Sequence, residues 1–183
     1  MEYLGLAARL LVGLVVVVAA VPKLRDPASF ASSVAAYTIL PESLVKPVAR
    51  ALPPAEIAMG VMLLAGVLII PAAMVAALLL VGFGGAIWVA VERGSKIGCG
   101  CGFRHLQQVS RVLVARNAVL AVAAAVAALA PSGALALLPG PGVPPTTIST
   151  TDALAVAVVV GAGWVLAQVA LELRRFVGSP LSA

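Results

Sequence analysis

The chain consists of long apolar runs separated by short polar stretches. The first run, from about Tyr3 to Val21, matches the length of about 20 helical residues that crosses a hydrocarbon core. Its acidic start at Glu2, without a basic region before it, favours a retained transmembrane helix over a cleaved signal peptide. The apolar positions are continuous and do not alternate, which excludes a β-barrel. The pattern predicts an all-α, polytopic membrane bundle.

Four more apolar runs follow, and five spans are expected in total. The second is expected to begin at Pro53 or Pro54, because proline is tolerated in the first turn of a helix. Pro71 is expected to separate it from the third. The expected ranges of these four spans are 53–70, 72–91, 109–130 and 153–173.

A mixed stretch, residues 27–50, lies between the first two spans. It is too short and too polar to cross a bilayer, and it suits an interfacial helix followed by a turn at Pro41. Lys46 and Arg50 are expected to face lipid headgroups.

Composition agrees with the membrane assignment. Hydrophobic residues make up 62% of the chain, charged residues 10%, and the mean hydropathy is +1.14, all far from the values of a soluble domain. The lipid bilayer is therefore the expected surrounding. The net charge of +5 does not point to nucleic acid, because the basic residues stand beside membrane segments, where they record topology.

Lysine and arginine gather in two of the short connections. One lies between the first two spans and the other between the third and fourth, and the remaining two connections carry none. Their basic residues are Lys23, Arg25, Lys46, Arg50, Arg93, Lys96, Arg104 and Arg111. The positive-inside rule predicts that both face the cytoplasm and that the N-terminus lies outside.

Ionisable and polar side chains inside the predicted spans are candidate site residues. A charge in the membrane costs about 2.5–3.5 kcal/mol on insertion scales, so such groups normally pair or line a cavity. Glu56, Arg116 and Asn117 fall inside predicted spans, and Lys23 stands at the cytoplasmic end of the first. These four residues are expected to converge as one cofactor-binding cluster. The structural alternative is a buried ion pair between Glu56 and Arg116 that only fixes helix register. Arg9 lies too far along its helix to join them and is expected to snorkel outward.

Both cysteines, Cys99 and Cys101, flank a single glycine in the connection 93–108, here called the Cys loop. A disulfide across one residue closes a small strained ring and is easily reduced. Lys96 and Arg104 favour the thiolate form that exchanges. The pair is therefore predicted to act catalytically in thiol–disulfide exchange.

Two alternatives remain for the Cys loop. Cys99 and Cys101, with His105 as a third ligand, would suit copper(I) or zinc, although no fourth ligand is evident, and no metal site is assigned. Otherwise both cysteines are tolerated in a glycine-rich loop of a structural membrane subunit.

A single cysteine pair cannot relay electrons across the bilayer, so electron transfer across the membrane would need a quinone or a partner protein. This favours an accessory redox protein over a free-standing enzyme.

An ordered set of short motifs resembles the MauE branch of the DoxX-like membrane proteins. The motifs are Arg9, Lys23-Leu24-Arg25-Asp26-Pro27 with Phe30, Tyr37-Thr38-Ile39-Leu40-Pro41, Leu52-Pro53-Pro54-Ala55-Glu56 with Gly60, Gly98-Cys99-Gly100-Cys101, Val109-Ser110 and Arg116-Asn117. Each motif is weak alone, and the combination is specific. One departure is visible, since the family usually reads Cys-Gly-Cys-Phe-Gly where this chain has Gly102-Phe103.

The resemblance covers about the first 130 residues and implies a four-helix core over residues 1–130. The expected outer loop and fifth transmembrane helix, residues 131–183, lie outside this shared core. It further implies a role in methylamine dehydrogenase maturation beside a thioredoxin-like partner. Membership of a larger membrane complex is a separate expectation for an accessory protein of this kind. The wider DoxX-like group is associated with sulfur and oxidative-stress metabolism. A cavity below the Cys loop would admit a quinone head or a small sulfur compound, and the sequence does not say which.

Overall fold

The computed structural model describes residues 1–95, 110–138, 140–143, 148–161 and 163–164. Its described part is all-α, as expected, with a single isolated β-bridge and no strand. The helices are α1 (Glu2–Arg25), α2 (Pro27–Ala36), α3 (Glu42–Ala65), α4 (Ile69–Glu92), α5 (Arg111–Leu129) and a shorter apolar helix, Thr150–Gly161.

Within this part of the chain, four helices are long and apolar enough to cross a membrane: α1, α3, α4 and α5. This confirms a polytopic helical membrane protein. The fifth span, expected over 153–173, is described only through helix Thr150–Gly161 and the short piece at 163–164. That helix alone is shorter than a span, and residues 165–173 lie outside the described residues.

The predicted start of the second span at Pro53 or Pro54 is wrong. Helix α3 begins at Glu42 and runs through both of these prolines. Proline inside a membrane helix is tolerated where packing holds the helix together, and Val45 and Ala49 are buried in the turns before Pro53. Residues 42–50 therefore belong to this long helix, while the expected turn before it is present at residues 37–41.

The predicted break at Pro71 is also displaced. Gly66 ends α3 in the left-handed conformation at φ +66°, and Val67 N–H donates to the carbonyl of Met62 at 2.8 Å, as in a Schellman cap. Helix α4 then starts at Ile69, so Pro71 sits in its first turn, where its missing N–H costs nothing. Helix α3 therefore ends at Gly66 because of the glycine, and Pro71 does not end it.

Helix α2 is the separate short helix that the mixed stretch predicted. Asp26 caps it, because its carboxylate accepts from the N–H of Ser29 at 2.9 Å, and Pro27 occupies the first helical position. Its buried residue is Phe30, which faces the end of α1.

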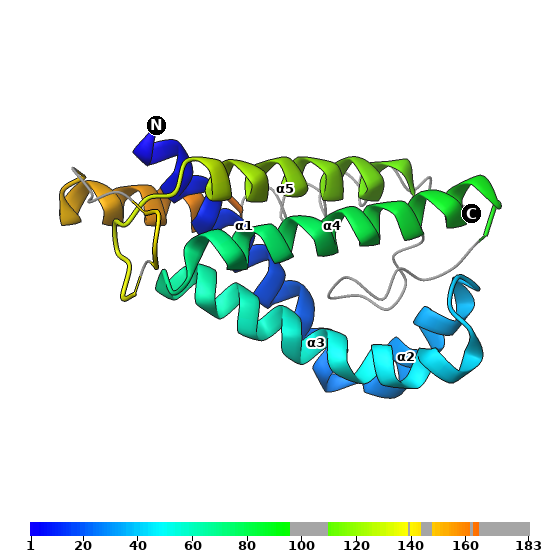
Figure 1. Cartoon of the computed structure of the whole chain (residues 1–183). Helices are drawn as coiled ribbons and strands as arrows, with labels where there is room; N and C mark the ends of the chain where they lie inside the picture. The colour runs from blue at the N-terminus through cyan, green and yellow to red at the C-terminus, as the bar shows by residue number, and fades with distance from the viewer. Residues whose placement is uncertain (96–109, 139, 144–147, 162, 165–183) are drawn as a thin grey trace, which may run out of the picture.

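The four long helices pack as two pairs. Helices α4 and α5 lie side by side along their length, and α1 packs against α3 (Figure 1). Glycines allow the second pair to approach closely, since a Cβ built on Gly60 would lie 3.0 Å from the carbonyl oxygen of Gly13. The shared core is mainly valine, leucine and alanine from all four helices. Contacts between α1 and α5 join the two pairs.

Chain segments that are distant in sequence close the end of the bundle where α3 meets α4. The loop after α5 pairs with the α3–α4 turn through Leu68 N–H to Leu138 O at 3.0 Å and Leu137 N–H to Ala65 O at 3.0 Å. Helix Thr150–Gly161 adds Ala153 to a cluster with Leu6 of α1. This end is therefore held by backbone hydrogen bonds as well as by apolar packing.

Candidate functional site

A buried ion pair joins α1 to α3. The Nζ of Lys23 lies 2.5 Å from Oε1 and 2.7 Å from Oε2 of Glu56, and each residue is 3% exposed. Both carboxylate oxygens therefore bind the same ammonium group. A pair of this kind is stable in a low-dielectric interior only when each charge keeps its partner.

Two aromatic rings complete the surroundings of the lysine. The Nζ of Lys23 lies 4.8 Å from the ring centroid of Phe83 on α4 and 5.3 Å from that of Phe30 on α2. Both distances fall in the range where a cation is attracted to an aromatic ring. Lys23 thus connects four elements: its own helix α1, the carboxylate on α3 and one ring each from α2 and α4.

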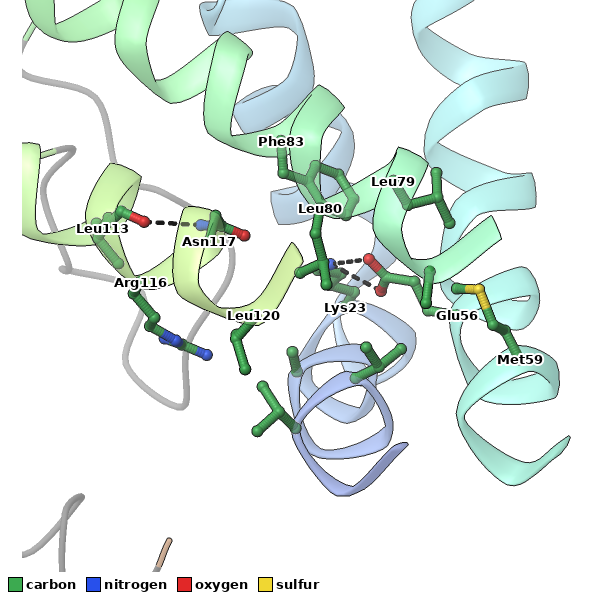
Figure 2. A pocket seen from close by; sticks show the side chains of 14 residues that line it. Lys23, Glu56, Met59, Leu79, Leu80, Phe83, Leu113, Arg116, Asn117 and Leu120 are labelled. Atoms are coloured by element: carbon green, nitrogen blue, oxygen red, sulfur yellow. Dashed lines mark hydrogen bonds and ion pairs between the residues drawn. The ribbon is translucent and has the colours of Figure 1, made fainter. Parts of the chain in front are cut away.

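The opposite side of the site is formed by α5. Arg116 and Asn117 project from this helix, across from the Lys23–Glu56 pair (Figure 2). The amide of Asn117 donates to the carbonyl of Leu113 at 2.8 Å. The guanidinium of Arg116 lies 5.5 Å from the ring centroid of Trp164. Its Nε is buried and has no hydrogen-bond partner in the part of the chain that the structure describes.

One cavity of about 40 Å³ lies among these side chains. The structure brings all four predicted polar residues, Lys23, Glu56, Arg116 and Asn117, to its wall. The other lining residues are apolar or aromatic: Val15, Val16, Ala19, Met59, Ala76, Leu79, Leu80, Phe83, Leu113 and Leu120. The site is thus a small, mostly apolar space with charged groups on two sides.

The structural alternative, an ion pair between Glu56 and Arg116, is wrong. Glu56 directs both oxygens to Lys23, and Arg116 lies against Trp164. The lysine is on α1, which packs directly against α3, whereas Arg116 lies on α5, across the cavity from the pair (Figure 2).

The expectation that Arg9 snorkels outward is also wrong. Its side chain is fully buried at the opposite end of α1, where Nη2 donates to Ala134 O at 2.7 Å and Nη1 to Ser132 O at 3.4 Å. Its Nε has no hydrogen-bond partner among the described residues. The acceptors belong to the loop after α5, and nothing local in the sequence links positions more than 120 residues apart.

The predicted thiol pair and its nearby histidine, Cys99, Cys101 and His105, lie outside the described residues. The site described here is therefore the polar cavity alone. Sequence reasoning missed the aromatic partners of the two cations, Phe83 and Trp164. No local signal marked either ring, because each contact joins residues on different helices.

Comparison with known proteins matches the larger part of the chain. A family model described as methylamine utilisation protein MauE matches residues 1–130. A methylamine utilization protein MauE of Paracoccus denitrificans is 41% identical over 135 residues, which is 72% of this chain and 73% of the relative. No solved structure matches the chain.

Two further relatives carry the same description and align over shorter stretches. The protein of Methylophilus methylotrophus is 44% identical over 106 residues, 57% of this chain and 55% of its own length. The protein of Methylorubrum extorquens is 42% identical over 109 residues, 58% of each chain. The matched region contains the polar cavity and the Cys loop. The chain belongs to the MauE family.

Proposed function

We propose that this chain is an accessory membrane protein of methylamine utilisation that exchanges disulfides with a partner protein through Cys99 and Cys101. The observation that carries the proposal is membership of the MauE family over residues 1–130, because the relatives are described as methylamine utilization proteins. The thiol chemistry rests on two cysteines that are separated by a single glycine within that region.

The chain path supports a relation between the thiols and the cavity. Helix α4 ends at Glu92 and α5 begins at Arg111, so the cysteines stand in the connection between two helices that line the cavity. Arg116 is five residues into α5, about 8 Å along its axis. Arg116, in the cavity wall, therefore lies near the end of the bundle to which the Cys loop is attached.

The proposed exchange has two steps. One thiolate of the reduced pair attacks a disulfide of the partner, a mixed disulfide forms, and one partner thiolate leaves. The second cysteine then attacks the mixed disulfide, which closes the Cys99–Cys101 bond and releases the partner as a dithiol. Two electrons pass from this chain to the partner, and the reverse sequence oxidises the partner. A thioredoxin-like protein is a partner of suitable chemistry.

Mass spectrometry of the native protein with and without reductant tests this directly. Exchange predicts a two-proton mass difference in the peptide that holds Cys99 and Cys101. Of Cys99→Ser and Cys101→Ser, the variant that lacks the resolving thiol should accumulate a mixed disulfide with the partner, and the variant that lacks the attacking thiol should lose exchange. Ser95→Ala, in the same connection, is the matched control and should behave as the parent. Free thiols under every growth condition would contradict the proposal.

The metal alternative gives a different result in the same preparation. Purified protein would carry near-stoichiometric copper or zinc, and both cysteines together with His105 would be needed to retain it. A structural subunit without chemistry of its own would tolerate the double serine variant in cells.

A quinone does not fit the cavity as the side chains lie. An apolar cavity that holds a benzene ring measures about 150 Å³, whereas this one measures about 40 Å³. We therefore assign no quinone step to these residues. Electrons from the thiols would pass to or from the partner protein.

We also propose that the Cys loop faces the cytoplasm. The basic residues of the two connections support this orientation, and several flank the described helix ends, including Arg25, Arg93 and Arg111. Labelling of single introduced cysteines in intact cells with a membrane-impermeant reagent tests it. Rapid labelling at Ser95→Cys would contradict the cytoplasmic placement, and Met1→Cys, preceded by a new start codon, is the outward-facing control.

A further inference from the structure

The wall of the cavity carries an excess of positive charge. Among its described lining residues, Lys23 and Arg116 are cationic and Glu56 is the one carboxylate. Both oxygens of Glu56 are bound to Lys23. The ion pair therefore neutralises itself and leaves the charge of Arg116 without a counter-ion from the described residues.

Arg116 has no polar partner in the described part of the chain. No hydrogen bond or ion pair there reaches its guanidinium, and its Nε is buried. Its one described interaction is with the ring of Trp164, at 5.5 Å. A cation–π contact offsets part of the cost of burial but satisfies none of the five N–H donors of the guanidinium. Next to it, the amide of Asn117 uses one of its two N–H groups on Leu113 and keeps the other.

The size of the cavity limits what those donors can bind. A water needs about 10–15 Å³ of such space, so about 40 Å³ holds about three waters or an ion of similar size. Formate, the smallest carboxylate, has three non-hydrogen atoms and matches this volume. A halide ion is smaller. A phosphate group with five non-hydrogen atoms, whether free or on a lipid, is too large.

We propose that this cavity binds a small monovalent anion of the carboxylate or halide class, held by Arg116 and Asn117. The planar guanidinium suits a carboxylate, which it can bind with two parallel hydrogen bonds. The anion would supply the charge that the described residues lack on this side, while the Lys23–Glu56 pair forms the opposite wall. This inference goes beyond the proposed thiol exchange and does not depend on it.

Thermal unfolding of the full-length protein in detergent tests the proposal. Sodium formate and sodium chloride are compared with sodium sulfate at equal ionic strength, because sulfate screens charge but exceeds the cavity in size. A saturable rise in Tm with formate, with chloride or with both supports the site and shows which anion it prefers. Sulfate also raises Tm by exclusion from the protein surface, without saturation. Equal Tm in all three salts, or a rise with formate and chloride that does not saturate, would overturn the proposal.

Substitutions on α5 show whether Arg116 is responsible for anion binding. Arg116→Gln should weaken formate or chloride binding by about tenfold or more, since it removes a charge-assisted contact. Arg111→Gln is the matched control, because it removes an exposed arginine from the same helix and should leave binding unchanged. Equal losses in both variants would show a general surface-charge effect and overturn the proposal.

A binding measurement makes the result independent of unfolding. The wild-type protein should broaden the NMR line of ¹³C-formate, and excess unlabelled formate should reverse the broadening. The broadening should be smaller with Arg116→Lys, which keeps the positive charge but loses the planar pair of N–H donors. Should Arg116→Gln fail to fold, these two proteins decide the matter. Broadening that is equal in both, or absent from the wild type, would contradict the assignment.

Discussion

Helix α1 buries two cations in different ways. Lys23 and Arg9 lie about 21 Å apart along the helix axis, and both are almost fully removed from the surface. Lys23 is matched by a full negative charge on Glu56 and by two aromatic rings. Arg9 is matched by two backbone carbonyls of the loop after α5.

The comparison indicates two different roles. An ion pair that borders a cavity can respond to a ligand, because the cavity leaves room for a third group. A guanidinium held by carbonyls joins its helix to a loop and fixes that loop in place. We therefore interpret the Lys23 end as the binding end of the bundle and the Arg9 end as its structural anchor.

The largest effect is expected from breaking the ion pair. Glu56→Ala leaves Lys23 buried without a counter-charge and should lower the free energy of unfolding by about 3–5 kcal/mol. Denaturant unfolding in detergent measures the loss. The double variant Lys23→Met with Glu56→Leu should recover most of it, since an apolar pair of similar volume can replace buried charges. A double variant as unstable as Glu56→Ala would show that the pair is not the cause.

The next effect concerns the anchor. Arg9→Met removes the donors that bind Ser132 O and Ala134 O and should cost about 3 kcal/mol. Hydrogen exchange should rise selectively in residues 130–138, and the cavity end should stay protected. Arg9→Lys should recover only part of the lost stability, because an ammonium group does not reproduce the planar set of N–H donors of a guanidinium group. Increased exchange throughout the bundle would argue against a local anchor.

A smaller loss is expected from the glycine beside that arginine. A Cβ on Gly66 would lie 2.5 Å from Nη1 of Arg9 and 2.5 Å from Cα of Ala136, in a left-handed backbone. Gly66→Ala should therefore cost about 2 kcal/mol through strain and crowding. Thermal unfolding measures it, with Gly82→Ala as the control, because a Cβ there meets no atom within 4 Å. Equal stability of the two variants would contradict this geometry.

The smallest expected effect belongs to the aromatic partner at the binding end. Phe83→Leu removes the ring 4.8 Å from Lys23 Nζ while keeping an apolar side chain, and it should cost about 1 kcal/mol. The loss should disappear in the Lys23→Met, Glu56→Leu background, where no cation remains. A loss of the same size in both backgrounds would assign the effect to packing alone.

Sequence by itself determined the fold class and identified the polar residues that line the cavity. Apolar run length depends only on local composition, so it identified the spans of α1, α4 and α5 and an all-α membrane protein. Polar and charged residues within or next to an apolar run are also a local signal, and they selected Lys23, Glu56, Arg116 and Asn117, which the structure places on one cavity. The resemblance to the MauE family was carried by short motifs that the family model also matches.

Tertiary structure decided the partners and two helix boundaries. Glu56 pairs with Lys23 because α1 packs against α3, and Arg9 finds its carbonyls because the loop after α5 returns to the start of α1. Helix α3 continues through Pro53 because buried neighbours hold it, although proline alone predicts an end. Such choices depend on contacts between segments far apart in the chain, and local propensity carries no information about them.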